Sequence, residues 1–324
     1  MDGAILQGMT GSSEDGPFEA EVIAAYGRHL LVRNGGGQEL RARPSGRRLS
    51  IVCGDRVRCE IDHKHDEVLI VEVLPRRTLL ARASMRGDSE PVVANITRLV
   101  VVLAPLPRPD LFIVDRYLCA ATAAGITGAL AVNKSDLEDD AQLRDELDAL
   151  TAAGYERVRC SAKGGQGLAE LRAMLATGVS VLVGQSGVGK SSLVRALLPD
   201  EVIATGDLMR EEEGRHTTTA SRAYRLENAA GGTGGTLIDS PGVRDFAPAI
   251  DQLDEKTLGF PELAARAGDC RFLDCKHLQE PSCAVIAAVE ANEMSARRYE
   301  SYRRLRRLYS DLVAARGPGQ RRKR

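Results

Sequence analysis

The chain has 324 residues, with 44 Lys and Arg against 45 Asp and Glu, so its formal net charge is −1. A hydrophobic content of 43% is enough for packed cores and excludes a wholly disordered chain. The balanced charge also argues against a protein that is basic throughout and binds nucleic acid with its whole surface.

The N-terminal segment, residues 1–17, is rich in Gly, Ser and Asp, and we expect it to be flexible. It has no basic stretch followed by an apolar run, so we expect no secretory signal. No window of about 18 strongly apolar residues predicts a membrane span. Seven cysteines, four of them scattered singly, fit a reducing compartment better than a disulfide framework. We therefore expect a cytoplasmic protein with no membrane partner, and a monomer by default.

Residues 18–76 predict a small closed β-barrel of the OB-fold type. Five short strand-like segments separated by turns cover residues 18–26, 29–34, 38–43, 56–62 and 67–75. Within them, residues 28–58 carry eight Arg against Glu39 and Asp55, a surplus of six positive charges. This surplus fits an ordinary solvated face or, as we favour, a surface that contacts RNA. Aromatic residues are few, which favours phosphate contact over base stacking.

After a linker at residues 75–91, residues 77–250 predict an α/β domain with a doubly wound sheet of about six strands. The expected strands cover residues 98–104, 128–133, 157–162, 178–184, 222–226 and 235–239. The expected helices cover residues 111–124 and 141–153, and a third begins at Lys190.

A phosphate-binding loop follows the strand at 178–184, where GQSGVGKS matches G-x-x-x-x-G-K-[ST] and a helix comes next. Backbone N–H groups of such a loop surround the β-phosphate, Lys190 reaches the β/γ oxygens, and Ser191 offers a hydroxyl to Mg²⁺. A bare glycine-rich turn is the plain alternative. The predicted nucleotide contacts here are Gly184, Gln185, Ser186, Gly187, Val188, Gly189, Lys190, Ser191 and Ser192.

Two further loops predict that the bound nucleotide is GTP. In Asn133-Lys134-Ser135-Asp136, Asp136 can accept hydrogen bonds from the guanine N1–H and 2-amino group, donors that adenine lacks. Lys134 would lie along the base, and Asn133 would tie this loop to the phosphate loop. Alone, the tetrapeptide could equally be a helix cap. The second loop is Ser161-Ala162-Lys163, in which the Ala162 N–H could donate to guanine O6.

The triphosphate end requires Mg²⁺ and γ-phosphate contacts, and two segments can supply them. Asp239-Ser-Pro-Gly242 offers a carboxylate for water-mediated Mg²⁺ contact and a glycine N–H for the γ-phosphate, although Pro-Gly also fits a simple turn. Residues 214–219, GRHTTT, offer a threonine hydroxyl, with Thr218 preferred and Thr217 second. The expected Mg²⁺ ligands are therefore Ser191, Thr218 and Asp239.

Near the C-terminus, Cys270-x₄-Cys275-x-His277-x₅-Cys283 matches a closed tetrahedral Cys₃His site for one structural zinc ion. The plain alternative is a coincidental set of cytosolic cysteines. The ion would stabilise a mostly helical module at residues 251–315 whose own core is thin.

Residues 295–324 carry 11 Lys and Arg against two acidic residues, a surplus of nine. They predict a helix with one packed and one basic face, followed by a flexible basic tail at 316–324. The basic face fits solvation or, more sharply, RNA phosphate contact.

The motifs occur in the order base loop, second base loop, phosphate loop, threonine loop and DxxG, whereas ordinary GTPases begin with the phosphate loop. The sequence therefore resembles the circularly permuted ribosome small-subunit-dependent GTPase (RsgA) family. The matching pieces are GQSGVGKSSL, GRHTTT, DSPGVRDF, NKSDL and the C-terminal cysteine cluster. The resemblance covers about residues 18–312. It implies an N-terminal OB-fold, a C-terminal zinc domain, and a role in late maturation of the small ribosomal subunit, which stimulates a slow GTPase.

The group that orients the attacking water is harder to identify from the sequence. In many GTPases it is a glutamine directly after DxxG, but that residue is Val243 here. The nearest replacement is His216, whose neutral imidazole can accept a hydrogen bond from water, and the resemblance implies the same role. A solvent-exposed loop histidine is the plain alternative. We thus expect His216, Lys190 and Thr218 to be the catalytic residues.

The sequence therefore predicts a GTP hydrolase. Its expected partners are GTP, GDP, the small ribosomal subunit and the rRNA of that subunit. Because the DxxG motif leads into the zinc domain, we expect the nucleotide state to control the grip on rRNA. Two alternatives remain at this stage: a P-loop kinase or metabolic enzyme, and an RNA-binding scaffold with a weakly active nucleotide site. Intact Lys190, Ser191, Asp136 and Asp239 argue against the scaffold.

Overall fold

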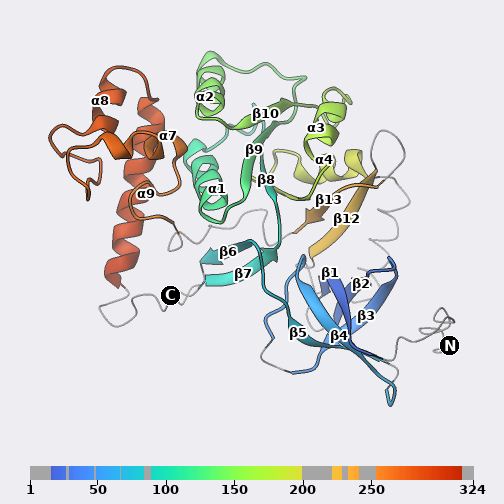
Figure 1. The fold of residues 1–324 in the computed structure, drawn as a ribbon. Helices are drawn as coiled ribbons and strands as arrows, with labels where there is room; N and C mark the ends of the chain where they lie inside the picture. Colours follow the sequence, from blue (N-terminus) through green and yellow to red (C-terminus); the bar gives the residue numbers. More distant parts are fainter. Residues whose placement is uncertain are drawn as a thin grey trace.

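The computed structural model describes residues 16–26, 29–46, 49–65, 67–83, 89–198, 221–227, 233–240 and 253–315. Figure 1 shows three parts: a β-barrel at the bottom, a sheet with helices in the middle, and a helical C-terminal part at the left. None of the helices in these residues is both long enough and apolar enough to cross a bilayer.

The N-terminal part is a closed five-stranded barrel. Its strand order is β1-β2-β3-β5-β4, and β4 pairs back onto β1 to close it, with β3 and β5 parallel to each other. Alternate apolar residues, among them Val22, Val32 and Ile70, point inward and are fully buried. This arrangement confirms the predicted OB-fold barrel. The strands are β1 (Phe18–Tyr26), β2 (His29–Asn34), β3 (Glu39–Pro44), β4 (Arg56–Asp62) and β5 (Glu67–Val73).

The segment predicted as a linker contains a β-hairpin instead, formed by β6 (Leu79–Ala83) and β7 (Ser89–Ala94). The hairpin packs closely against the barrel, because Cys53 bridges to Val93 and a Cβ on Gly54 would stand 2.1 Å from the Ala94 carbonyl oxygen. The φ of Gly54, +88°, also favours glycine. The connection between the two domains, predicted only as a linker, therefore contributes two paired strands that pack against the barrel.

The middle part is a six-stranded sheet, called here the central sheet, with the order β10-β9-β8-β11-β13-β12. All neighbours in it are parallel except β12, which runs antiparallel to β13. The predicted doubly wound sheet is confirmed, including its strand count. The strands are β8 (Arg98–Leu103), β9 (Thr127–Val132), β10 (Glu156–Arg159), β11 (Val179–Val183), β12 (Ser221–Glu227) and β13 (Thr233–Asp239).

Helices cover both faces of the central sheet. Along β8, Leu99 and Val101 face a core shared with α1 (Leu111–Ala123) and α2 (Ala141–Ala152). The intervening Val100 and Val102 face a second core shared with α3 (Leu168–Met174) and α4 (Lys190–Leu197). This period-two alternation of fully apolar residues is what a strand buried on both faces requires.

The barrel and the central sheet are joined edge to edge. Strand β1 pairs antiparallel with β12, with Ala24 opposite Arg222 and Ala25 opposite Ser221. The two sheets therefore form one eleven-stranded sheet in hydrogen-bonding terms. The strand that carries this junction, β12, is also the direct neighbour of β13, which ends at Asp239.

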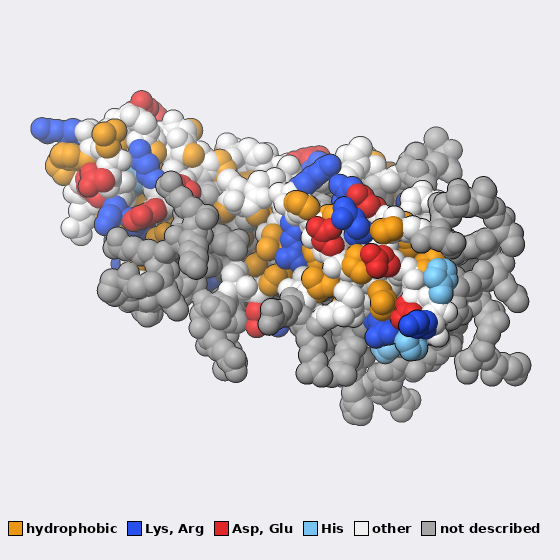
Figure 2. All heavy atoms as spheres, turned by 60° about the horizontal axis from the view of Figure 1, so that its bottom comes forward, with side chains coloured by type: hydrophobic (Ala, Val, Ile, Leu, Met, Phe, Trp, Pro, Cys, Tyr) orange, Lys and Arg blue, Asp and Glu red, His pale blue; other side chains and the backbone are white. Residues whose placement is uncertain are grey.

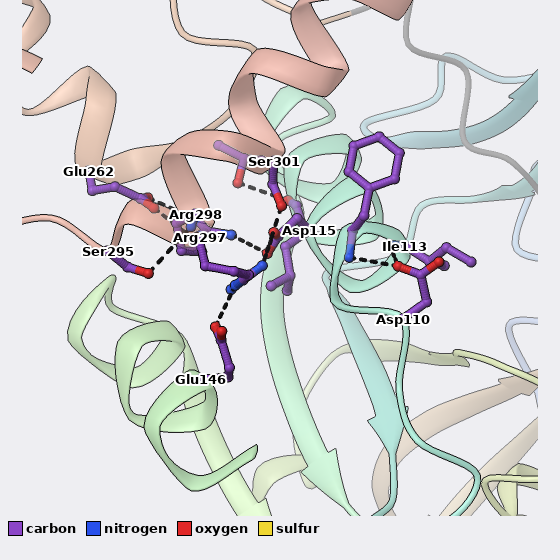
Figure 3. Close-up of polar contacts among 12 residues, drawn as sticks. Asp110, Ile113, Asp115, Glu146, Glu262, Ser295, Arg297, Arg298 and Ser301 are labelled. Carbon is purple, nitrogen blue, oxygen red and sulfur yellow. Dashed lines mark hydrogen bonds and ion pairs between the residues drawn. The ribbon is translucent and has the colours of Figure 1, made fainter. Parts of the chain in front are cut away.

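The C-terminal part contains α7 (Pro261–Ala264), a 3₁₀ helix (Ala267–Asp269), α8 (Ala284–Glu290) and α9 (Ala296–Ala315). It is fixed to the central sheet's helices by ion pairs that Figure 3 shows around α1. Asp115 of α1 accepts hydrogen bonds from both Arg297 and Arg298 of α9. Arg298 also pairs with Glu262, and Arg297 with Glu146 of α2. Since both Asp115 and Arg298 are 1% exposed, this junction is a buried charge network.

Candidate functional site

The predicted nucleotide motifs converge at one edge of the central sheet. Strands β9, β10, β11 and β13 are parallel, so their carboxyl ends meet at the same edge, where α/β sheets bind their ligands. The base loop follows β9, the second base loop follows β10, the phosphate loop follows β11, and Asp239 ends β13. Four motifs that lie apart in the sequence thus become neighbours.

The phosphate loop is held open by glycines between β11 and α4. Gly184 has a φ of +134°, and a Cβ there would stand 2.2 Å from the Val102 carbonyl oxygen. Within the loop, the Lys190 ammonium donates to the carbonyls of Gly184, at 2.5 Å, and Gln185, at 2.7 Å. With only 7% of its surface exposed, Lys190 is held inside the loop by these two carbonyls.

The first turn of α4 carries the two serines that the sequence assigns to the site. Ser191 and Ser192 are exposed at the N-terminus of this helix, directly after the phosphate loop. A hydroxyl in this position can reach a Mg²⁺ ion that bridges phosphates. The backbone N–H groups of the same turn favour negative charge.

Asn133 connects the base loop to both of its neighbours. Its side chain is 2% exposed, donates to the Val188 carbonyl at 2.8 Å, and accepts from the Ala162 N–H at 3.0 Å. Lys134 donates to the Gly187 carbonyl at 2.8 Å. The predicted tie between the base loop and the phosphate loop is present in the hydrogen bonds of both residues.

The Asp136 side chain is exposed and can accept hydrogen bonds. The Ser161 hydroxyl donates to its Oδ1 at 2.7 Å, and this hydrogen bond holds the pKa of Asp136 below its usual value. The carboxylate therefore stays ionised and can accept the two donors of a guanine edge. Lys163, two residues after Ser161, is also exposed at this end of the site.

At the γ-phosphate end the described residues are fewer. Asp239 is half-buried at the end of β13, and the next residue, Ser240, is buried with its hydroxyl 2.6 Å from that of Ser221. The predicted residues His216, Thr217, Thr218 and Gly242 lie outside the residues that the structure describes.

One part of the site escaped the sequence analysis: the connection from β8 to α1, residues 104–110. The Leu106 carbonyl accepts from the Lys134 ammonium at 2.7 Å, and the Asp110 N–H donates to the Gln185 side chain at 3.4 Å. This connection follows the central parallel strand, so it emerges between the base loop and the phosphate loop. Its position in the strand order was the available signal, because a backbone carbonyl has no sequence motif.

The cysteine cluster forms a second site in the C-terminal part. The ligand atoms of Cys270, Cys275, His277 and Cys283 all lie within 4.8 Å of one another. The sulfur–sulfur distance from Cys270 to Cys283 is 3.9 Å, and His277 Nδ1 lies 3.5 Å and 3.4 Å from these two sulfurs. A tetrahedral zinc ion requires about 3.8 Å between sulfurs and about 3.6 Å between sulfur and nitrogen.

The chemistry of the cluster also fits a cation. Burial raises the pKa of the Cys275 thiol to about 12, and it raises the pKa of Cys283 as well. Burial lowers the pKa of His277, which keeps its imidazole neutral and able to ligate. Buried thiols of this kind ionise only when a metal ion compensates the charge, so the residues fit structural zinc.

Many arginines of the two segments with a basic surplus form ion pairs with carboxylates in the structure. Figure 2 shows Lys and Arg beside Asp and Glu over the barrel. In the barrel, Arg33, Arg43, Arg56 and Arg58 pair with Glu39, Glu67, Glu19 and Glu72. In α9, five arginines are paired, namely Arg297, Arg298, Arg303, Arg304 and Arg306. Much of the predicted RNA-binding charge is therefore also paired with carboxylates of the same chain.

Comparison with known proteins decides the family. The sequence profile described as RsgA GTPase matches residues 73–248, which include the base loops, the phosphate loop and the DxxG motif. The chain belongs to the RsgA GTPase family. It is therefore a GTPase, and the kinase interpretation is set aside.

Relatives in this family match most of the chain. The "Small ribosomal subunit biogenesis GTPase RsgA" of Pseudomonas aeruginosa (strain LESB58) is 41% identical over 290 residues, which are 88% of this chain and 84% of the relative. The protein of the same name from Haemophilus influenzae (strain 86-028NP) is 38% identical over 318 residues, 95% of this chain and 88% of the relative.

Solved structures agree on the RsgA fold. YjeQ from Thermotoga maritima superposes with a TM-score of 0.71 at 28% identity, covering 94% of this chain and all of that one. YloQ, described as a circularly permuted GTPase, superposes with a TM-score of 0.68 at 25% identity, covering 94% and 97%. The fold of this chain, with its permuted GTPase domain, therefore has counterparts among solved structures over most of its length.

Proposed function

We propose that this RsgA-family GTPase acts in late maturation of the small ribosomal subunit, to which it binds through rRNA. The observation that carries the proposal is the convergence of both base loops and the phosphate loop at one sheet edge, in a chain matched over most of its length by small-subunit biogenesis GTPases. We further propose that it works as a monomer in the cytoplasm.

The nucleotide would be held from both ends. Asp136 reads the guanine edge, Lys134 lies along the base, and the Ala162 N–H serves O6, with Asn133, Ser161 and Lys163 supporting these contacts. Residues 184–192 surround the phosphates, with Lys190 on the β/γ oxygens. Mg²⁺, which neutralises developing charge on the phosphates, would be held by Ser191, Asp239 and Thr218, and the Gly242 N–H would meet the γ-phosphate.

For hydrolysis, the proposed residue that orients the attacking water is His216. Val243, the residue after Gly242, has an alkyl side chain and can neither accept nor donate a hydrogen bond. Near pH 7, a neutral imidazole in the threonine loop can accept a hydrogen bond from the attacking water. This assignment rests on chemistry and on the family resemblance.

The outer two parts would hold the subunit. The Cys₃His cluster is proposed to bind one structural zinc ion, which shapes the C-terminal part for rRNA contact. The barrel adds a second contact. Because β12 joins the barrel to the strand that ends at Asp239, the state of the γ-phosphate can be passed to the barrel, which would let GTP and GDP forms grip rRNA differently.

The test is GTP turnover with and without purified small subunits across a salt series. The proposal expects turnover to rise strongly when subunits are added, and the stimulation to fall steeply with salt. It also expects tighter subunit binding with a non-hydrolysable GTP analogue than with GDP. Absence of stimulation at low salt would overturn the role on the subunit, and equal binding in both nucleotide states would overturn the coupling.

Guanine reading has its own test. Replacing Asp136→Asn exchanges an acceptor for a donor, which should move the preference from guanine nucleotides toward xanthine nucleotides. An unchanged preference would overturn the assignment of Asp136.

A further inference from the structure

The two base loops are held together by a series of contacts that extends beyond the recognised motif. Asn133 accepts from the Ala162 N–H at 3.0 Å, the Ser135 N–H donates to the Cys160 carbonyl at 3.0 Å, and Asp136 accepts from Ser161. Each of these three contacts joins a residue of the base loop to a residue of the second base loop or to Cys160, directly before it. A fourth follows them, between Asp139 and Arg159.

The fourth contact is an ion pair with one buried partner. The Asp139 side chain is 3% exposed and accepts from Arg159 Nη1 through Oδ2, whereas the Arg159 side chain is 42% exposed. The Asp139 carbonyl also accepts from Arg144 of α2 at 3.0 Å. Asp139 comes three residues after Asp136, and Arg159 comes two residues before Ser161. The pair thus ties the base loop to the second base loop just outside the residues that would touch the base.

Few neighbouring groups could replace this ion pair in holding the base loop. Ser135, Leu137 and Glu138 line a cavity of about 550 Å³ on the outer side of the base loop, next to Arg144 and Arg159. Leu137 is exposed and does not pack into the core. No described residue donates to Asp139 Oδ1, so Arg159 is the only partner that the described residues give this buried carboxylate's oxygens. A buried carboxylate that loses its partner carries a large desolvation cost, which makes the link strong.

We propose that the Asp139–Arg159 pair is a positioning element for guanine specificity. It holds the Asp136 carboxylate where this can accept hydrogen bonds from the N1–H and 2-amino groups of guanine. This inference rests on the proposed guanine site. The pair touches no nucleotide itself, and it acts by fixing the loop that does. Losing the pair lets Asp136 move away from the guanine edge while the phosphate loop stays in place.

The experiment compares the dissociation constants of GDP and IDP, since the hypoxanthine base lacks only the 2-amino group. Arg159→Gln, Asp139→Asn and the double variant are expected to weaken GDP about tenfold and IDP less, because IDP has only the N1–H contact with Asp136 to lose, so that the GDP preference shrinks. The double variant should lose little beyond either single one, because one link is removed in each case. Arg159→Lys, which keeps the charge, should retain most of the preference.

Arg157→Gln is the matched control. Arg157 also lies on β10, two residues before Arg159, but it pairs with Asp148 of α2, whose side chain is 70% exposed. Its loss should leave the GDP preference unchanged. If the Asp139 variants fail to fold, the partly exposed Arg159 still provides the test. An unchanged GDP-to-IDP ratio in the Arg159→Gln protein, or equal weakening of both nucleotides, would overturn the positioning role. No GDP preference in the unaltered protein would instead overturn the guanine site itself.

Discussion

Asn133 shows how much a single buried amide can hold in this site. It is 2% exposed and joins the phosphate loop, through Val188, to the second base loop, through Ala162. We predict that Asn133→Ala weakens GDP and IDP binding alike, by about tenfold or more, because both loops lose their connection and two buried polar groups lose their partners. Nucleotide titration measures this. Unchanged affinity for both nucleotides would contradict the prediction.

His216 is a residue whose chemistry can be tested even though it lies outside the described residues. We predict that His216→Ala keeps GTP affinity and slows hydrolysis by about 100-fold, because general-base and water-orienting contacts are worth about that much. Single-turnover hydrolysis at saturating protein separates the two effects. His65→Ala, in the exposed turn between β4 and β5, serves as the control. An unchanged hydrolysis rate in the His216 variant would end the assignment.

At this scale, chemistry made some residues predictable and others not. Lys190 and Asp136 could be assigned from sequence because phosphate and guanine recognition require fixed residue types at fixed spacing. Leu106 could not, because it acts through its backbone carbonyl, which every residue has. Asp139 and Arg159 are common surface residues, and only the fold shows that one of them is 3% exposed.

Among the elements, the loop of the cysteine cluster depends on Glu280. This carboxylate accepts from the backbone N–H groups of Lys276, Leu278 and Gln279, which flank His277, and hydrogen bonds from the backbone lower its pKa to about 2 against the loss of solvation. It is therefore charged throughout the range from pH 5 to 8. It fixes the chain on both sides of His277.

We predict that Glu280→Gln speeds the transfer of zinc to a chelator by about tenfold, since groups that orient metal ligands affect affinity on this scale. The expected acceleration of zinc transfer is the same at pH 6 and pH 8, because the Glu280 carboxylate does not titrate between these two values. Glu290→Gln, on the exposed side of α8, is the control. Equal zinc retention in both variants would show that Glu280 does not hold the loop.

The strands and helices followed from sequence where the hydrophobic pattern was long and regular. Strand β8 reads as a continuous apolar run, and its two-sided burial confirms that reading. Helix α3 was missed because its seven residues span barely two turns and begin after Gly167, without a capping side chain. The hairpin of β6 and β7 was missed because charged and small residues interrupt its short apolar runs.

For the whole molecule, the net charge of −1 conceals an uneven distribution that ion pairs partly cancel. The two basic segments contain nineteen Lys and Arg, and at least nine of the arginines that the structure describes pair with carboxylates. Each phosphate contact adds about −0.9 to the slope of log affinity against log salt. For binding to small subunits, we predict a slope clearly shallower than the value of about −17 that nineteen phosphate contacts would give. A slope of about −17 would mean that the paired arginines change partners on RNA.

The three parts are connected to different halves of the nucleotide site. The C-terminal part is fixed to α1 and α2 by the Asp115 network, on the side of the base loops (Figure 3). The barrel continues from β12, next to the strand that ends at Asp239 (Figure 1). Beside the route from the DxxG motif into the C-terminal part that the sequence predicts, the structure therefore offers a second route from the γ-phosphate end, through β12 into the barrel.

Ser221 lies on this route and allows the coupling to be tested without touching the nucleotide. Its hydroxyl is 2.6 Å from that of Ser240, the residue after Asp239, and its backbone pairs with Ala25 in the barrel. We predict that Ser221→Ala leaves hydrolysis without subunits unchanged, but lowers the ratio of subunit affinities between a GTP analogue and GDP by about threefold to tenfold, the value of one hydrogen bond.

The matched control is Ser180→Ala. Ser180 is a fully buried serine of β11, and no described group hydrogen-bonds to its hydroxyl. Its replacement should leave the affinity ratio as it is, because it removes no link between the parts. Subunit binding in both nucleotide states, measured by co-sedimentation, provides the two ratios. If the two variants change the ratio equally, general loosening of the core is responsible. If only Ser221→Ala changes it, the signal travels from Asp239 through β12 into the barrel.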